Sequence, residues 1–228
     1  QTDPQRNFLL QTSILDRLCG PLCDAVTQQE NGRQRLNALE KANLFVIPLD
    51  DKRRWYRYHH LFADLLEKRL RRKQSDLLTK LHSRASHWFA SNGFKNDAVD
   101  HALIAQDYAL AVQLIEEIAE IDWDRARESQ LLRWFKKLPA ENVDANPKLC
   151  IFYARELFKS GYLDEAEKKL RVAEQVLEST SIKELSKEGL LGRIAVIRAN
   201  MSTLRGDLSG TIILSNQALR LLPEMDLN

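Results

Sequence analysis

A histidine pair, His59-His60, stands where a candidate β-hairpin passes into a candidate amphipathic helix. Two stretches rich in β-branched and aromatic residues, 44–49 and 53–58, flank an Asp-Asp-Lys run, which is a pattern typical of a hairpin. Over residues 59–73, apolar side chains recur at helical spacing opposite a charged face. These apolar residues are Leu61, Phe62, Leu65, Leu66 and Leu70. The sequence therefore predicts a hairpin that leads directly into a helix, with both histidines at the helix start.

Helical segments are also expected before the hairpin, at 4–12, 21–28 and 33–43. Proline near a helix start and the break at Gly32 support these limits. Helices followed by a hairpin and a further helix are the element order of a winged-helix domain. We place this domain at residues 1–74.

Beyond this domain the pattern is purely helical and contains an internal repeat. Each of three glycines is followed by small residues five and twelve positions later. The sets are Gly93, Ala98 and Ala105; Gly161, Ala166 and Ala173; and Gly206, Thr211 and Ala218. Small residues seven apart let one helix lie close against the preceding helix, and the glycine closes the turn between them. This pattern predicts helical hairpins of the tetratricopeptide (TPR) type.

We therefore expect a mainly α protein, with a winged-helix domain that has one β-hairpin, followed by a TPR-like right-handed superhelix of helical hairpins. Residues 75–140 are expected to form linking helical hairpins, because the helices between 108 and 138 fit the repeat poorly. Residues 141–228 are expected to form the TPR-like repeats. The run 223–228 offers no polar capping helix, so we expect only the start of a longer superhelix.

Charge and hydropathy exclude several classes of protein. A net charge of +2, from 34 basic and 32 acidic residues, gives no global electrostatic reason to expect nucleic-acid binding. No apolar run approaches the roughly 20 residues that a membrane span requires. The first residues lack the basic and apolar regions of a signal peptide. We expect a cytoplasmic protein with no membrane partner.

The cysteines Cys19, Cys23 and Cys150 are an odd number in a chain without a secretion signal, so reduced and buried thiols are expected. A zinc site at Cys19 and Cys23 is the alternative. The spacing around Gly20-Pro21 and the lack of a second such pair favour no metal.

Basic residues on the hairpin and on the following helix could form a strip for duplex DNA. They are Arg53, Arg54, Arg57, Lys68, Arg69, Arg71, Arg72 and Lys73. We favour the simpler interpretation, in which this is a solvated helix face on a domain that acts within its own protein.

Scattered histidines and aromatic residues are weaker candidates for a site. His82, His87 and His101, with Asp97 or Asp100, could be imagined as a hydrolytic site, but no nucleophile or oxyanion motif accompanies them. We therefore expect no catalytic residues and no enzyme activity in the isolated chain. The aromatic residues Trp88, Phe89, Trp134 and Phe135 are expected to pack in the core.

Four blocks of sequence resemble a single family. They are FLLQTSILDRL at 8–18, PLCDAV at 21–26, LEKANLF at 39–45 and WYRYHHLFADLL at 55–66. These blocks resemble the MalT-type large ATP-binding regulators of the LuxR class, which belong to the STAND group of signal-transduction ATPases. The resemblance covers about residues 5–120 and implies an order of parts: a nucleotide-binding domain, a winged helix, a helical repeat sensor for an inducer, and a C-terminal helix-turn-helix that binds DNA.

This chain would hold only the middle of that arrangement. No glycine is followed by the Lys-Ser or Lys-Thr of a phosphate loop, so we expect no cofactor in this chain and ATP or ADP only in the full-length protein. The partners implied are its own nucleotide-binding domain, a small-molecule inducer or regulatory protein on the helical repeats, and DNA only through a helix-turn-helix absent here.

The resemblance also assigns a role to the histidine pair. In the STAND group the winged helix commonly supplies a histidine, in a Met-His-Asp type motif, that touches the phosphate of bound ADP. The alignment places His59 at the histidine and His60 at the aspartate. A ring donor at a helix N-terminus suits an anion, because free backbone N–H groups and the helix dipole favour negative charge there. The choice between His59 and His60 stays open, as does the alternative that they cap the helix or pack under the wing.

We therefore expect the regulatory middle segment of an ATP-dependent LuxR/MalT-like transcriptional activator, which couples nucleotide state to inducer or partner sensing by the helical repeats. The alternative is a TPR-like protein-interaction scaffold with no nucleotide or DNA role.

Overall fold

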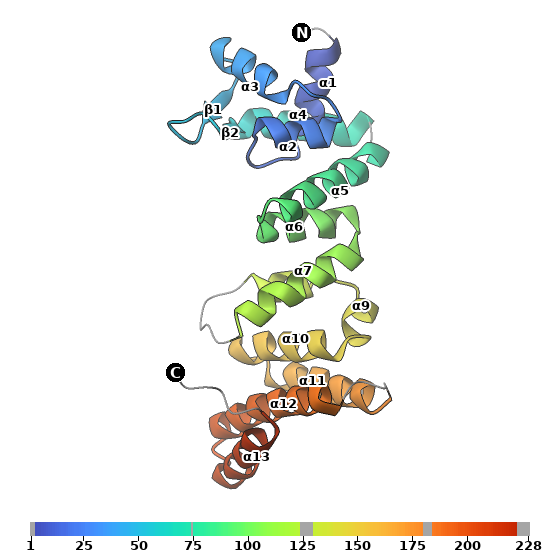
Figure 1. Cartoon of the computed structure of the whole chain (residues 1–228), viewed down its shortest axis with the longest axis vertical. Coiled ribbons are helices and arrows are strands. Elements are labelled where there is room, and N and C mark those ends of the chain that lie inside the picture. Colours follow the sequence, from blue (N-terminus) through green and yellow to red (C-terminus); the bar gives the residue numbers. More distant parts are fainter. Residues whose placement is uncertain (1–2, 74, 124–129, 180–183, 223–228) are drawn as a thin grey trace. The chain divides into compact units, whose positions relative to one another are not determined.

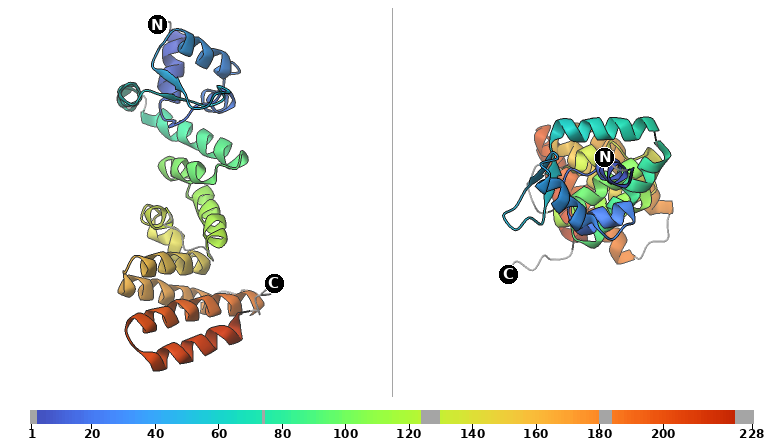
Figure 2. Two further views of the ribbon diagram at one scale, coloured as in Figure 1. Left: turned by 90° about the vertical axis from the view of Figure 1, so that its left-hand side faces the viewer. Right: turned by 90° about the horizontal axis from the view of Figure 1, so that it is seen from above.

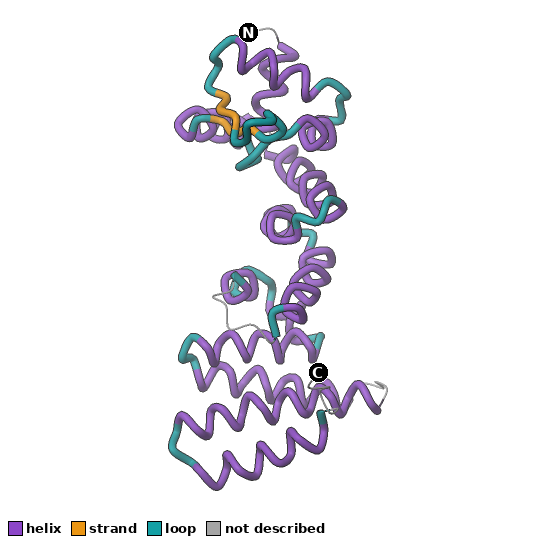
Figure 3. The backbone as a smooth tube through the Cα atoms, turned by 60° about the vertical axis from the view of Figure 1, so that its left-hand side comes forward, coloured by secondary structure: helices purple, strands orange, loops and turns teal. Residues whose placement is uncertain are grey.

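The computed structural model describes residues 3–73, 75–123, 130–179 and 184–222. The chain divides into two compact units, Gln1–Leu114 and Ile115–Asn228. Within the described residues the only sheet is a two-stranded hairpin, and helices account for nearly all other regular structure (Figure 3). The expected winged helix followed by helical hairpins is therefore confirmed as the fold class. The domain boundaries at 74 and 140 stay predictions, and the run 223–228 lies outside the described residues.

The first unit begins with the winged helix and continues into a helical hairpin (Figure 1). Its elements are α1 (Asp3–Thr12), α2 (Gly20–Thr27), α3 (Gly32–Lys41), β1 (Val46–Pro48), β2 (Tyr56–Tyr58), α4 (His60–Lys73), α5 (Ser75–Ser91) and α6 (Lys95–Ala105). Helix α7 (Tyr108–Ile121) crosses from the first unit into the second. The elements of the second unit are α8 (Leu131–Phe135), α9 (Ala140–Asp144), α10 (Pro147–Lys159), α11 (Leu163–Ser179), α12 (Glu184–Leu204) and α13 (Leu208–Leu221).

The predicted hairpin is present, with shorter strands than the sequence indicated. β1 and β2 are antiparallel, and Ile47 is opposite Arg57. Phe45 (φ 57°) and Arg53 (φ 50°) adopt left-handed backbone conformations, which cannot take part in strand pairing because extended strands require negative φ. β1 therefore starts only after Phe45, and the loop between β1 and β2 is longer than the sequence indicated. Leu18 exchanges backbone hydrogen bonds of 2.7 and 2.8 Å with Tyr56, and so adds a third extended segment beside β2.

A buried hydroxyl pair and a partly buried arginine hold the first unit together. The Thr12 hydroxyl lies 2.8 Å from the Tyr58 hydroxyl, which links α1 to β2 within the core. Arg17 donates a 2.8 Å hydrogen bond to Asp97, and its guanidinium lies 4.7 Å from the ring centre of Trp55 in the hairpin and 4.5 Å from that of Phe94. Since Phe94 and Asp97 belong to the α5–α6 hairpin, Arg17 fastens that hairpin to the winged helix.

The three glycines of the repeat lie where the sequence predicted them, in the turns of the helical hairpins α5–α6, α10–α11 and α12–α13 (Figures 1 and 2). Gly93, Gly161 and Gly206 adopt φ of 80°, 83° and 75°, a left-handed conformation that glycine takes without the strain of a side chain. The small residues that follow them are buried in the first two hairpins, at Ala98, Ala105, Ala166 and Ala173. In the third, Ala218 is buried and Thr211 is half-buried. The predicted helical hairpins are confirmed.

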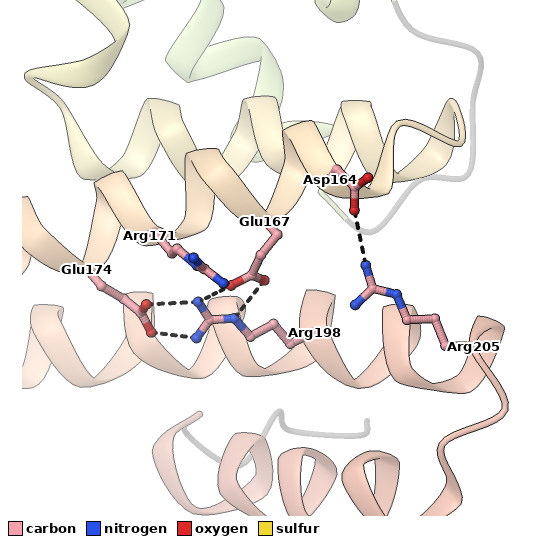
Figure 4. Close-up of polar contacts among 6 residues, drawn as sticks. All are labelled: Asp164, Glu167, Arg171, Glu174, Arg198 and Arg205. Atoms are coloured by element: carbon pink, nitrogen blue, oxygen red, sulfur yellow. Dashed lines mark hydrogen bonds and ion pairs between the residues drawn. The ribbon is translucent and has the colours of Figure 1, made fainter.

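An ionic cluster joins α11 to α12 (Figure 4). Arg198 of α12 contacts the Glu174 carboxylate at 2.6 and 2.8 Å, and the Glu167 carboxylate at 2.9 and 3.1 Å. Burial tends to raise the pKa of Glu167, but hydrogen bonds from Arg198 and Arg171 outweigh this effect and leave the pKa below its usual value. A bidentate arginine between two carboxylates fixes the register of the two helices.

Replacing Arg198 with methionine is expected to destabilise the second unit by about 1 to 3 kcal/mol. The stability lost when a partly buried ion pair is broken lies between the small loss for an exposed pair and the large loss for a fully buried pair. Arg171→Met is the matched control: its side chain also contacts Glu167 but is 71% exposed, so a loss below about 0.5 kcal/mol is expected. Urea unfolding followed by circular dichroism measures both. Equal losses in the two variants would contradict a specific role for Arg198.

Candidate functional site

The two histidines lie at the N-terminus of α4, as the sequence predicted. His59 precedes the helix: its backbone N–H donates to the Phe45 carbonyl at 2.8 Å, and its carbonyl accepts from Ala63 at 3.0 Å. The imidazole rings of His59 and His60 stack with centroids 4.5 Å apart. His59 is half-buried and His60 is exposed.

Two backbone donors accompany the rings. In the described part of the chain, the N–H groups of His60 and Leu61 have no hydrogen-bond acceptor. The first N–H groups of a helix are left free in this way and favour negative charge. An anion brought to this helix end would therefore meet imidazole and amide donors together.

A groove of about 500 Å³ runs beside the histidines. It is lined by residues from the segment before α2, from the hairpin and from α4, namely Ser13, Ile14, Leu15, Asp16, Ile47, Arg57, Tyr58, His59, His60, Ala63, Asp64 and Glu67. Ser13, Ile14, Leu15 and Asp16 were not predicted as site residues, because they reach the groove only through the tertiary fold.

The charge of the groove limits what it binds by itself. Asp16, Asp64 and Glu67 line the groove together with one arginine, Arg57, and Glu67 is also bound by Arg71. Three carboxylates against two arginines leave one net negative charge, with the histidines counted as neutral. Desolvation by the surrounding protein raises the pKa of the Asp16 carboxyl, and the charges of Asp97, Asp100 and Glu67 add to this effect. Such a groove does not concentrate a polyphosphate without cations supplied by another domain.

Exposed apolar side chains border the histidine pair. Leu61 is 66% exposed and Leu65 is 63% exposed, whereas Leu66 and Leu70 on the same helix are buried. Phe45, which is 55% exposed, stacks on Phe62 with ring centroids 4.9 Å apart. The apolar residues of α4 thus lie partly in the core and partly on the exposed surface. Exposed apolar side chains such as Phe45, Leu61 and Leu65 are typical of a surface that binds another protein or domain.

The basic strip of hairpin and α4 is partly neutralised. Arg53 pairs with Glu40 at 3.1 Å, Arg54 lies 3.9 Å from Asp50, and Arg71 donates to Glu67 at 2.5 Å. These pairs leave fewer cations available for nucleic-acid phosphates than the sequence alone indicated. The side chain of Lys73 lies outside the described residues.

Of the scattered histidines, the fold brings two together. His82 and His101 are buried between α5 and α6, with their Nδ1 atoms 2.8 Å apart. Burial and the neighbouring His101 lower the pKa of His82 to about 3, and burial lowers that of His101 to about 4. His87 is on the surface, 3.9 Å from Asp107, and Asp97 is held by Arg17. Nε2 of His82 is buried and has no hydrogen-bond partner among the described residues, so no hydroxyl or thiol is bonded to that ring atom.

The remaining candidates from the sequence are core residues. The thiols of Cys19, Cys23 and Cys150 are free and buried, as expected. Phe89, Trp134 and Phe135 are buried, and Trp88 packs edge-on against Phe89, so their predicted packing role is confirmed. Among the described residues, no three His, Cys, Asp or Glu side chains gather in a way that could hold a metal ion. No described helix is both long and apolar enough to span a membrane.

Comparison with known proteins identifies the first unit's main component. The family model of the MalT winged helix domain matches residues 1–78. The HTH-type transcriptional regulator MalT of Cronobacter sakazakii is 30% identical over 218 residues, which cover 96% of this chain and 24% of that protein. MalT of Klebsiella pneumoniae (strain 342) is 30% identical over 221 residues, with the same coverage.

A relative of a different kind is similar over a shorter stretch. The serine/threonine-protein kinase PknK of Mycobacterium tuberculosis is 41% identical over 144 residues, which cover 63% of this chain and 13% of the kinase. The chain thus spans about a quarter or less of the curated relatives that it matches.

Proposed function

Because the chain is a MalT-type fragment whose residues 1–78 form a MalT winged helix domain, we propose that it is the regulatory middle segment of an ATP-dependent LuxR/MalT-like transcriptional activator. It couples the state of a bound nucleotide to sensing by the helical hairpins. The catalytic and DNA-reading steps belong to other parts of the full-length protein, and this segment catalyses nothing itself.

One observation carries the proposal: related segments occur in proteins with different outputs. One relative is named as a helix-turn-helix regulator and another as a protein kinase, yet both align with this chain. A segment that accompanies two unlike outputs is better suited to controlling an output than to performing it. This supports coupling as the role of the winged helix and the first hairpins.

The α4 N-terminus is the proposed point of nucleotide sensing. In the resting protein His59 donates a hydrogen bond to a phosphate of ADP, and the free N–H groups of α4 add to this contact. Phe45, Leu61 and Leu65 form the apolar part of the surface on which the nucleotide-binding domain docks. Because the groove is acidic, that domain supplies most of the cations around the nucleotide.

The helical hairpins are the proposed sensor. Their left-handed glycines and buried alanines support a TPR-like stack, in which an inducer or regulatory protein binds and biases rotation of the winged helix. Arg17 supplies a direct mechanical link, since it joins the hairpin loop of the wing to α6.

A protein-interaction scaffold is the second candidate function. It is favoured by one feature, an exposed apolar face on α13. Its members are Leu208, Ile212, Ile213 and Leu219, which are between 63% and 78% exposed. Under this alternative the winged helix only packs against the repeats and has no nucleotide role.

Sequencing the complete gene separates the two functions. The regulator requires a Gly-Lys-Ser or Gly-Lys-Thr phosphate loop upstream and a helix-turn-helix downstream of this segment. A complete gene without a phosphate loop would remove the nucleotide role and leave the scaffold.

A further inference from the structure

The second unit contains a pocket of about 340 Å³ between the end of α8, helix α10 and helix α11. Small-molecule sites begin at about 300 Å³, so this volume suits a compact ligand. The buried Leu157 lies in its wall, and two tyrosines and three lysines surround it. None of these residues takes part in the candidate site on the winged helix.

Its aromatic walls are held in different ways. Tyr153 of α10 stacks on the buried Phe135 with ring centroids 4.9 Å apart and an interplanar angle of 13°. Tyr162, in the turn after Gly161, is 46% exposed. Neither hydroxyl has a hydrogen-bond partner among the described residues, and burial raises the pKa of Tyr153 further above neutral pH.

The lysines at the rim differ in whether they are neutralised. Lys169 pairs with the Asp144 carboxylate. Lys136 lies 5.1 Å from the ring centre of Tyr162, and neither Lys136 nor Lys168 has a carboxylate partner in the described chain. With Glu165 also at the rim, these two lysines leave a net charge of one positive unit, from two lysines minus one glutamate.

We propose that this pocket binds a small organic monoanion that carries a flat apolar ring, an aromatic carboxylate in chemical class. The ring packs against Tyr162 and Leu157, and the carboxylate accepts hydrogen bonds from the ammonium groups of Lys136 and Lys168. The single net charge favours a carboxylate over a phosphate dianion. A sensory meaning for this binding rests on the proposed function, whereas the binding itself does not.

The test uses this chain with 2-naphthoate as probe, followed by calorimetry and by NMR shifts of the tyrosine rings. Saturable binding with a dissociation constant on the order of 1 mM or below is expected, given the size of the probe. 2-Naphthalenemethanol, which lacks the charge, and acetate, which lacks the ring, are each expected to bind about tenfold more weakly or not at all.

Variants locate the binding. Lys136→Gln is expected to weaken naphthoate binding about fivefold, and Tyr162→Leu about tenfold. Lys137→Gln is the control: it removes the same charge from the neighbouring lysine and should leave naphthoate binding unchanged. Circular dichroism checks that each variant is folded, and all three positions are exposed. Absence of naphthoate binding, equal binding of the uncharged alcohol, or equal affinity in the Lys136 and Lys137 variants would overturn the proposal. ADP takes no part in this test, so such a failure leaves the coupling role standing.

Discussion

Replacing Gly32 with alanine is expected to destabilise the winged helix by about 3 kcal/mol, the upper end of the usual cost of overpacking. A methyl group at this position would lie 2.6 Å from the Gly20 carbonyl oxygen, 2.9 Å from Cβ of Cys23 and 2.9 Å from Oδ1 of Asp24. The Gly32 N–H also donates to that Asp24 oxygen at 2.6 Å, so relief of the clash breaks a hydrogen bond. The first turns of α2 and α3 can touch only because this position lacks a side chain.

Gly189→Ala in α12 is the matched control, because a methyl group there meets nothing within 4 Å. Alanine is a better helix former than glycine, so this change is expected to stabilise the chain by about 0.5 to 1 kcal/mol. Urea unfolding of both variants compares the signs directly. A neutral or stabilising Gly32→Ala would show that α2 and α3 are not in close contact.

Lowering the pH from 7 to 5 is expected to destabilise the first unit by up to about 4 kcal/mol through His82 and His101. Their pKa values are depressed in the folded protein, to about 3 and about 4, against about 6.5 when unfolded. At pH 5 the unfolded chain binds protons that the folded chain does not, which costs about 2 kcal/mol per histidine. Stability is therefore fully present above about pH 6.5 and falls as the pH drops toward the folded pKa values.

The predicted loss of stability is measured as the difference between the free energies of unfolding at pH 7 and at pH 5, in two variants. His101→Gln keeps a hydrogen-bonding side chain but removes one titrating group, so about half of the loss should disappear. His87→Gln removes an exposed histidine and should leave the loss unchanged. If His101→Gln retains the whole pH dependence, the buried pair is not its source.

Local patterns predicted the elements of this fold well, because their physics is local. Gly93, Gly161 and Gly206 each need a left-handed backbone at a turn, and the spacing to the next small residue follows from one helix face. The first hairpin also has a small buried residue, Ser86, seven positions before its glycine, which matches Ala154 and Ala199 in the later two.

Contacts between distant residues could not be predicted in the same way. The helical spacing grouped Leu61, Leu65, Leu66 and Leu70 as one apolar face, but only the folded structure shows that Leu61 and Leu65 are exposed. His82 and His101 meet because α5 and α6 fold back on each other, which fixes a register that periodicity does not encode. For the candidate site, the sequence located His59 and His60 at the helix start, whereas the acidic lining from Asp16 emerged only with the tertiary structure.

The most direct test of the central claim is the affinity of the full-length protein for ADP with His59 replaced by alanine. Loss of a hydrogen bond to a charged phosphate is expected to weaken ADP binding about tenfold or more and to raise basal transcriptional activation. His87→Ala, which removes an exposed histidine of α5, serves as control and should bind ADP as the unaltered protein does. Unchanged ADP affinity in the folded His59→Ala protein would contradict a role for His59 in nucleotide sensing.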